Sequence, residues 1–335
     1  STRNREVTRR GRARRGEARL GRARRGLARQ GRAGRGRARR GVAWHGKARR
    51  GAAGQGEAWQ GEEIGKMSTT IIAEPGSTHD GDFDKALELI EVAKKAGADV
   101  CKFQWWSNPR QLAERRKAKT YLPIYQKYQY PKTWLKGLAE HCTRHGIEFA
   151  CTVYCQEDLP AILPFVKRLK IASFENQDFD FIKACLATGL EVIISTGMSH
   201  HLDIRKLVEV IERQGAAGRT VLLQCTSSYP CAIKELHLRV LHELASLTDC
   251  RLGFSDHSRS EITGALAVAQ GAQVVEKHIQ LARTDNRNPD AVCALLPSQF
   301  VRYVENIRTA EKALGRAVKQ VTAGEIPMSK YKVKL

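Results

Sequence analysis

The chain has 335 residues, a formal net charge of +22 and 42% hydrophobic residues. It has no run of about 18 apolar residues, which argues against a membrane-spanning helix, and no apolar core near its start that would indicate a signal peptide. Its nine cysteines, an odd number at scattered spacings, favour reduced thiols in a cytoplasmic protein over a disulfide-bonded secreted one.

The positive charge is concentrated in the first 66 residues, which carry 21 Lys and Arg against 5 Glu. Gly recurs at every fifth residue from Gly11 to Gly61, a period that matches neither a helix nor a strand. We therefore predict a disordered, low-complexity Gly- and Arg-rich tail over residues 1–66. Three roles are open for it: nucleic-acid binding through phosphate contacts, a targeting arm, or translated upstream sequence ahead of a natural start at Met67.

From Thr69 onward the sequence repeats one pattern, in which a short apolar run is followed by a polar turn and an amphipathic stretch. The apolar runs predict eight strands, at residues 69–74, 99–104, 148–152, 169–173, 191–196, 220–226, 251–255 and 273–278. The amphipathic stretches predict eight helices, near residues 83–96, 132–145, 157–166, 178–188, 202–214, 235–246, 260–270 and 298–314.

Eight alternating units over about 250 residues predict an α/β fold of the (β/α)8 TIM-barrel type. We expect the barrel to span residues 67–320 and to be followed by a C-terminal extension over residues 321–335. A doubly wound open sheet is the alternative, although such a sheet seldom needs eight regular units.

A barrel of this type gathers its functional groups at the carboxyl ends of its strands. The polar residues at the predicted ends are Glu74, Lys102, Thr152, Lys170, Ser173, Ser195, Thr196, Thr226, Ser227, Ser255, Asp256, His257 and His278. Both lysines lie within apolar runs, where an unpaired ammonium group would be costly to bury. We therefore expect these lysines and the neighbouring hydroxyl groups to bind a phosphorylated, carboxylated anion.

His257 and His278 end the last two predicted strands, which are neighbours in a barrel. Two imidazoles placed in this way could hold one divalent cation and leave coordination positions open for water and substrate. Manganese, magnesium, zinc and iron would all suit such a site. The histidines in predicted helices and loops, among them His141 and His145, are interpreted as ordinary structural residues.

Short segments at or near the predicted strand ends form a recognisable series. They are Ile72-Ala73-Glu74-Pro75-Gly76 with His79 and Gly81, Cys101-Lys102-Phe103-Gln104, Lys170-Ile171-Ala172-Ser173, Ser195-Thr196-Gly197-Met198, Gln224-Cys225-Thr226-Ser227-Ser228-Tyr229-Pro230, Phe254-Ser255-Asp256-His257, Glu276-Lys277-His278 and Pro289-Asp290. In this order and at these positions they resemble the sialic acid synthase family (N-acetylneuraminate synthase and its relatives) from about residue 69 to residue 319.

The resemblance implies a cytoplasmic transferase of carbohydrate biosynthesis. Such an enzyme would condense phosphoenolpyruvate with an N-acetylated amino-sugar aldehyde, such as N-acetylmannosamine, to give a sialic-acid-type nonulosonic acid and phosphate. It would hold a divalent metal, manganese or magnesium, on His257 and His278. Glu74 is the candidate for proton transfer, and Gln104, Tyr229 and Asp290 would contact the sugar. The residues implied to hold phosphoenolpyruvate are Lys102, Thr152, Lys170, Ser173, Ser195, Ser227 and Ser255.

The sequence departs from the family pattern at several points. Thr78 replaces an Asn, Pro75 stands where a branched apolar residue is common, and Ala294 replaces a Ser. Typical members continue into a small antifreeze-like domain that lends an Arg to the sugar site of a dimer partner. We therefore consider three alternatives: a separate antifreeze-like domain or chain supplies this Arg, the substrate is different, or the sequence is a fragment. A homodimer is possible.

Two other functions are compatible with these residues. One is a metal-dependent barrel aldolase or lyase that acts on another sugar. The other is a catalytically weakened barrel that acts as a binding protein, with its Arg-rich tail engaging nucleic acid or a membrane surface.

Overall fold

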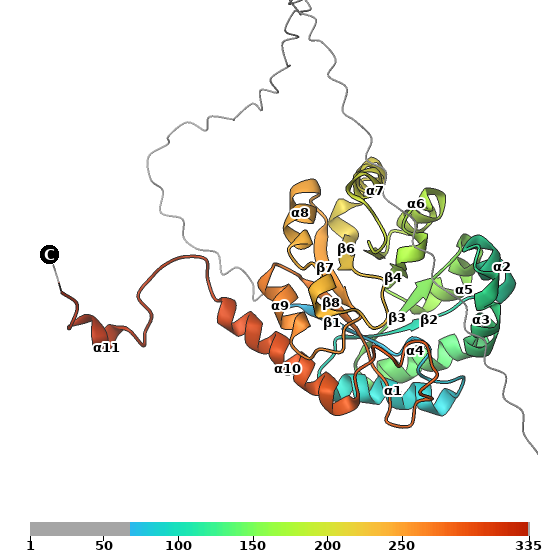
Figure 1. Cartoon of the computed structure of the whole chain (residues 1–335), viewed down its shortest axis with the longest axis horizontal. Coiled ribbons are helices and arrows are strands. Elements are labelled where there is room, and N and C mark those ends of the chain that lie inside the picture. The colour runs from blue at the N-terminus through green and yellow to red at the C-terminus, as the bar shows by residue number, and fades with distance from the viewer. Residues whose placement is uncertain (1–67, 334–335) are drawn as a thin grey trace, which may run out of the picture. The chain divides into compact units, whose positions relative to one another are not determined.

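The computed structural model describes residues 68–333, so the prediction for the tail over residues 1–66 lies outside the described residues. Eight parallel strands form a closed barrel in the order of the sequence, surrounded by helices (Figure 1). The strands are β1 (Thr70–Glu74), β2 (Val100–Gln104), β3 (Glu148–Val153), β4 (Arg168–Ile171), β5 (Glu191–Ser195), β6 (Thr220–Cys225), β7 (Arg251–Asp256) and β8 (Val274–His278). The predicted (β/α)8 barrel is confirmed, and the doubly wound sheet is wrong because β1 pairs with β8.

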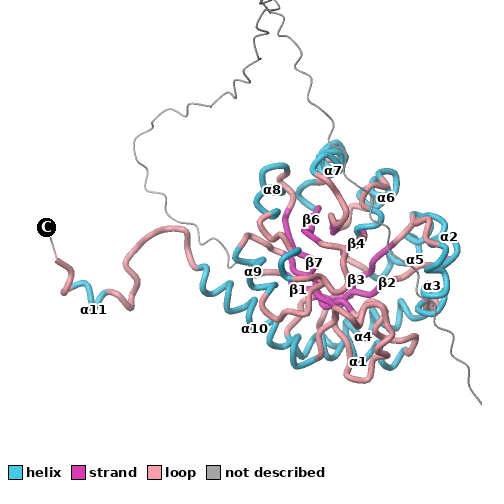
Figure 2. Tube along the Cα trace, viewed as in Figure 1, coloured by secondary structure: helices cyan, strands magenta, loops and turns pink. Residues whose placement is uncertain are grey.

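The helices follow the predicted amphipathic stretches, with α2, α3 and α11 as additions. They are α1 (Phe83–Ala96), α2 (Pro109–Arg115), α3 (Leu122–Tyr128), α4 (Thr133–His145), α5 (Leu159–Ile162), α6 (Phe179–Ala187), α7 (His201–Arg213), α8 (Val240–Leu247), α9 (Thr263–Ala269), α10 (Pro297–Leu314) and α11 (Ile326–Ser329). The helix predicted near residues 157–166 is reduced to α5 between two 3-10 turns. Figure 2 shows α2 and α3, which the sequence pattern did not predict, beside the β2 side of the barrel.

Helix α1 shows how local sequence sets an element. Asp82 caps its start by accepting a hydrogen bond from the Lys85 backbone N–H at 3.1 Å. Gly97 ends the helix in the left-handed conformation, with φ of 90°, which glycine adopts without steric cost. The buried face between these ends consists of Ala86, Leu89, Ile90, Ala93 and Ala96, as the 3.6-residue period predicts.

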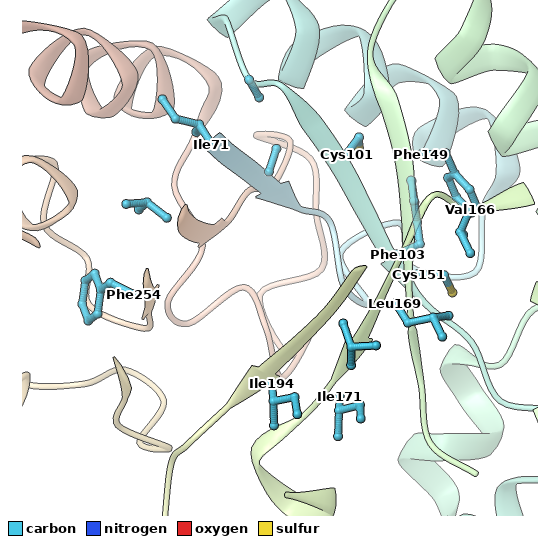
Figure 3. Close-up of a cluster of buried hydrophobic side chains, with 14 of the residues drawn as sticks. Ile71, Cys101, Phe103, Phe149, Cys151, Val166, Leu169, Ile171, Ile194 and Phe254 are labelled. Carbon is cyan, nitrogen blue, oxygen red and sulfur yellow. The ribbon is translucent and has the colours of Figure 1, made fainter. Parts of the chain in front are cut away.

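The two-residue period of the strands sorts side chains between two environments. Alternate residues, such as Ile71, Phe103 and Ile194, pack between the strands and the surrounding helices (Figure 3). The other set points into the barrel, where a separate apolar cluster fills the lower interior: Ile72, Val100, Ala150, Ile193, Val221, Leu223 and Val274. This packed interior forms a solid base beneath whatever lies at the carboxyl ends of the strands.

The barrel is closed by β1 and β8, which pair in register from Thr70 with Val274 to Glu74 with His278. Helix α10 packs against α9 and α1, and its Arg308 donates a hydrogen bond to the Thr69 carbonyl at 2.9 Å. Residues 315–333 follow α10 and are exposed. Over the residues that the structure describes, no helix combines the length and the apolar character needed to cross a membrane.

Candidate active site

A cavity of about 610 Å³ opens at the carboxyl ends of the strands, within the size range of small-molecule sites. All of the site residues predicted from the sequence line it. They are Glu74, Lys102, Gln104, Thr152, Lys170, Ser173, Ser195, Ser227, Tyr229, Ser255, His257, His278 and Asp290. Residues from every part of the barrel sequence therefore converge on one space.

Strand alternation explains how charged side chains reach this space. On five of the strands, the inward position two residues after the apolar one is polar: Glu74 follows Ile72, and Glu276 follows Val274. The inner surface is thus apolar at its base and polar one layer higher. We call the polar layer, formed by Glu74, Lys102, Thr152, Lys170, Ser195, Ser255 and Glu276, the floor of the cavity.

Lys102 is the centre of the floor. Its Nζ contacts a carboxylate oxygen of Glu74, lies 3.7 Å from Oε2 of Glu276, and donates a hydrogen bond to the Thr152 hydroxyl at 3.0 Å. Glu276 also accepts a hydrogen bond from the Ser255 hydroxyl at 3.1 Å. All of these side chains are buried, so one ammonium group serves two carboxylates away from bulk water.

The two carboxylates differ in proton affinity. Burial raises the pKa of Glu74 to about 7, because Lys102 offsets the desolvation only in part and the charge of Glu276 adds to it. Burial also opposes ionisation of Glu276, but Lys102 and Lys170 outweigh it and lower the pKa of that carboxyl to about 2. Near neutral pH Glu276 is therefore ionised, and Glu74 can both hold and release a proton.

Lys170, on β4, is the second lysine of the floor. Its Nζ donates hydrogen bonds to the Ser195 hydroxyl at 2.7 Å and to the Ile171 carbonyl at 2.9 Å, and burial lowers the pKa of this lysine. Gly197 allows two further hydroxyls to approach, since a Cβ there would lie 2.3 Å from Oγ of Ser227 and 2.7 Å from Oγ of Ser173. Ammonium and hydroxyl donors are thus grouped as an oxyanion ligand requires.

The two predicted metal-binding histidines face each other across the β7–β8 seam, with ring centroids 5.6 Å apart. Nδ1 of His257 donates to the Thr226 carbonyl at 2.9 Å, which leaves Nε2 available as a ligand atom. Nδ1 of His278 is buried and has no hydrogen-bond partner among the described residues, and burial lowers the pKa of this imidazole to about 4. A neutral, unpartnered imidazole is suited to bind a cation.

Three polar residues expected at the strand ends do not line the cavity. Thr196 and Thr226 donate their hydroxyls to the backbone carbonyls of Leu223 and Glu235, at 2.9 and 2.8 Å. Asp256 is fully buried on the outer side of β7, where it pairs with Lys277 of β8 at 3.1 Å. Because His257 and His278 directly follow these two residues, the ion pair fixes the strands that carry them.

The residues expected to contact the sugar stand above the floor. Gln104 donates to Glu74 at 2.8 Å, and Tyr229 packs over the His257 ring at a centroid distance of 4.1 Å. Asp290 accepts hydrogen bonds from the Ser77 backbone N–H and hydroxyl, both at 2.7 Å. The turn before Ser77 needs glycine, since Gly76 has φ of 55° and a Cβ there would lie 2.4 Å from the Asp290 carboxylate.

Comparison with known proteins identifies the family of this barrel. Residues 89–319 match the family model described as the NeuB family. The chain belongs to the NeuB family. This result confirms the resemblance to sialic acid synthases, and the protein is accordingly an enzyme of that family.

Individual relatives agree with this assignment to the NeuB family. The N,N'-diacetyllegionaminic acid synthase of Legionella pneumophila is 32% identical and covers 78% of this chain and 78% of its own length. The N-acetylneuraminate-9-phosphate synthase of Mus musculus is 30% identical and covers 78% of this chain and 76% of its own. The crystal structure of a sialic acid synthetase from Leptospira borgpetersenii, in complex with citrate, superposes with a TM-score of 0.72 at 28% identity, covering 79% of this chain and 91% of that one.

Several residues of this NeuB-family cavity were missed by the sequence reasoning. Glu276 was seen only as part of a motif, although the two-residue spacing before His278 places both in the interior. The upper side is formed by side chains from α2, α3, the turn between them and the loops after β2, β3 and β4, which carried no periodic signal. We call this surface the aromatic wall and define it as Trp106, Tyr121, Tyr125, Tyr154 and Phe174, with Arg116 among them.

A second polar group of this NeuB-family protein lies on α1 and α4, outside the cavity. Nε2 of His141 is 3.1 Å and Nε2 of His145 is 3.9 Å from Oε1 of Glu91. Their potential ligand atoms are close enough together to hold a metal ion. Because His141 is already hydrogen-bonded by Glu91 and Arg144, at 3.1 Å each, the group is also complete without an ion.

Proposed function

We propose that this NeuB-family enzyme joins phosphoenolpyruvate to the aldehyde carbon of an open-chain N-acetylated amino sugar and releases phosphate. The observation that carries the proposal is the convergence of two buried lysines, a ring of hydroxyls and two imidazoles on one cavity. The names of the relatives support it, since the proteins from Legionella and mouse are synthases of acidic sugars.

The floor would bind phosphoenolpyruvate. Lys102 and Lys170 supply positive charge, and Ser195, Ser173 and Thr152 supply hydroxyl groups for the phosphate and carboxylate oxygens. Both lysines already hold protein partners at 2.7–3.0 Å, so their ammonium groups are oriented before the substrate arrives. Such preorganised charge is more effective in a buried site than in water.

The reaction forms a carbon–carbon bond between the two substrates, adds water to the second carbon of phosphoenolpyruvate, and cleaves the bond between that carbon and the phosphate oxygen. The third carbon of phosphoenolpyruvate would attack the aldehyde carbon, and the aldehyde oxygen would take up a proton. Water would then add to the second carbon, after which phosphate leaves with the bridging oxygen. We assign the proton transfer to Glu74, because its pKa of about 7 allows it to exist in both protonation states near neutral pH.

We further propose that His257 and His278 hold a divalent metal, with manganese and magnesium as the expected ions. The unpartnered, buried Nδ1 of His278 and the free Nε2 of His257 support this assignment. When bound, such an ion would polarise the aldehyde oxygen as a Lewis acid. We also propose a cytoplasmic location, which the nine unpaired cysteines support.

The test compares phosphate release by the wild type and by His278→Ala, with phosphoenolpyruvate, N-acetylmannosamine and manganese present. We expect turnover to fall about 1,000-fold and manganese binding, followed by calorimetry, to weaken in parallel. His242→Ala is the matched control, since His242 is an exposed residue of α8 that bonds Gln270. Undiminished turnover in His278→Ala would contradict the proposal, and pyruvate release from a sugar acid without phosphoenolpyruvate would indicate an aldolase instead.

A further inference from the structure

The aromatic wall lines the upper half of the cavity, and the polar atoms of Trp106 and Tyr154 are already hydrogen-bonded within the protein. The Trp106 indole N–H donates to the Tyr125 carbonyl at 3.1 Å, and the Tyr154 hydroxyl donates to Gln104 at 2.5 Å. The Trp106 ring packs edge-on against Tyr125 and Tyr154, with centroid distances of 6.0 and 5.6 Å. Tyr121 and Phe174 continue the wall to its rim, where they are 54% and 56% exposed.

Each positively charged side chain that lines the described part of the cavity already has a binding role or an ion-pair partner. Among the described residues, the lysines and arginines that line it are Lys102, Lys170 and Arg116. The two lysines belong to the floor, where the proposed function uses them for phosphoenolpyruvate. Arg116 forms a two-pronged ion pair with the buried Glu175, at 2.7 and 2.9 Å, so its charge is neutralised within the protein.

The surroundings of Arg116 also turn its guanidinium into part of the wall. The group lies over the rings of Tyr154 and Phe174, at 4.8 and 4.5 Å from their centroids, and donates to the Tyr125 hydroxyl at 3.3 Å. Releasing Arg116 for a ligand would leave the Glu175 carboxylate buried and unpaired. Among the residues that the structure describes, the upper half of the cavity therefore offers no available cation for a second phosphate group.

From this distribution we propose that the aldose substrate is unphosphorylated and carries apolar substituents, N-acyl groups or a deoxy carbon, at the end remote from its aldehyde. The inference rests on the proposed function, which places phosphoenolpyruvate on the floor and the sugar above it. Methyl groups and C–H bonds pack well on aromatic faces, whereas a phosphate dianion on the same faces would lose its hydration without gaining a partner. The two named relatives differ on this point, since only the mouse enzyme is named for a phosphorylated product.

The experiment measures kcat/KM for three aldoses with the full chain, phosphoenolpyruvate and manganese. The sugars are N-acetylmannosamine, its 6-phosphate, and a 2,4-diacetamido-2,4,6-trideoxyhexose of the same configuration at carbon 2. We expect the trideoxy sugar to be the best substrate and the 6-phosphate to be about 100-fold poorer than N-acetylmannosamine. Preference for the 6-phosphate would overturn the inference and leave the proposed function standing. If none of the three sugars supported phosphate release, both would be overturned.

A positive charge added at the rim of the wall tests whether the lack of a cation there determines the preference for an unphosphorylated sugar. Tyr121→Lys adds a cation at an exposed position of the wall, and we expect it to raise kcat/KM for the 6-phosphate relative to N-acetylmannosamine about tenfold, with the KM for phosphoenolpyruvate unchanged. Leu202→Lys, at a 65% exposed position of α7, is the matched control and should leave the ratio unchanged. An unchanged ratio in a folded Tyr121→Lys variant would show that charge in the upper half does not determine the choice of sugar.

Discussion

The floor and the aromatic wall of the cavity are built in different ways. The floor stands on β-strands, whose register fixes each side chain, and it consists of charged and hydroxyl groups that hold one another. The wall stands on two short helices and three loops, and it consists of ring faces around a neutralised arginine. In the proposed function, the groups that would meet a reacting atom stand on rigid strands, whereas the groups that would select the sugar stand on short helices and loops, which tolerate changes in length more readily.

The largest effect should come from removing the central charge of the floor. Lys102→Met leaves Glu74 and Glu276 buried without their shared ammonium partner, so we expect the free energy of unfolding to fall by about 4 kcal/mol and phosphate release to disappear. Urea denaturation followed by circular dichroism measures the first effect. Lys136→Met, at an exposed ion pair with Glu140, should be nearly neutral by comparison.

A double variant separates the two roles of Lys102. Adding Glu276→Gln to Lys102→Met removes one of the stranded carboxylates and should recover part of the stability, but not the activity. Equal stability of Lys102→Met and wild type would show that the floor does not depend on this charge, and that the strands alone determine its structure.

The next effect concerns the proton held by Glu74. Its carboxyl has a pKa of about 7 in the folded protein against about 4.5 when unfolded, so the folded state keeps a proton that the unfolded state loses. The stabilising contribution is fully present below pH 4.5 and is lost as the pH rises through 7, by about 3 kcal/mol in total. Glu276, whose pKa is lowered to about 2, contributes in the opposite direction, and its contribution is lost only as the pH falls from about 4.5 through 2.

Urea denaturation of the wild type and Glu74→Gln at pH 4.5, 5.5 and 7.5 measures this difference. Relative to the variant, the wild type should become less stable at each step, because Gln cannot lose a proton. A constant difference across the three pH values would mean that Glu74 is ionised throughout and is held by Lys102 as a simple ion pair. In that case Glu74 would be the wrong residue for proton transfer.

The smallest effect should come from the wall. Tyr125→Leu removes one ring face and the acceptor of the Arg116 hydrogen bond, so we expect the KM for the aldose to rise about tenfold. The KM for phosphoenolpyruvate should stay within about twofold of the wild type, since the floor is unchanged. Tyr331→Leu, at a 69% exposed position beyond α10, is the control. A rise in both KM values would contradict the separation of floor and wall.

The sequence was sufficient to predict most of the strand-borne side chains that line the cavity. Lys102 and Lys170 stand out because each interrupts an apolar run, and His257 and His278 stand out because each lies at the carboxyl end of an apolar run. Asp256 shows the limit of this reasoning, since it also ends a strand but faces outward, and only the pairing of β7 with β8 reveals its ion pair with Lys277. A one-residue difference in position decides between the cavity and the outer layer.

The aromatic wall also could not be predicted from the sequence, but for a reason that differs from the one given for Asp256. Helices α2 and α3 have seven residues each, too few for a hydrophobic period to be recognised, and they are fixed by caps and tertiary contacts instead. Asn108 caps α2 by accepting from the Arg110 and Gln111 backbone at 3.0 and 3.2 Å, a signal that is visible only once the helix is known. Glu175, the partner of Arg116, lies in the turn after β4, 59 residues further along the sequence.

The contact between Thr69 and Arg308 has a practical consequence for handling the enzyme. It brings together the points where the chain enters β1 and where it leaves α10, both on the side of the barrel opposite the cavity. A tether attached at the end of α10 would therefore begin on the side of the barrel away from the mouth. The barrel could be anchored to a solid support at this point and still take up substrate freely from solution.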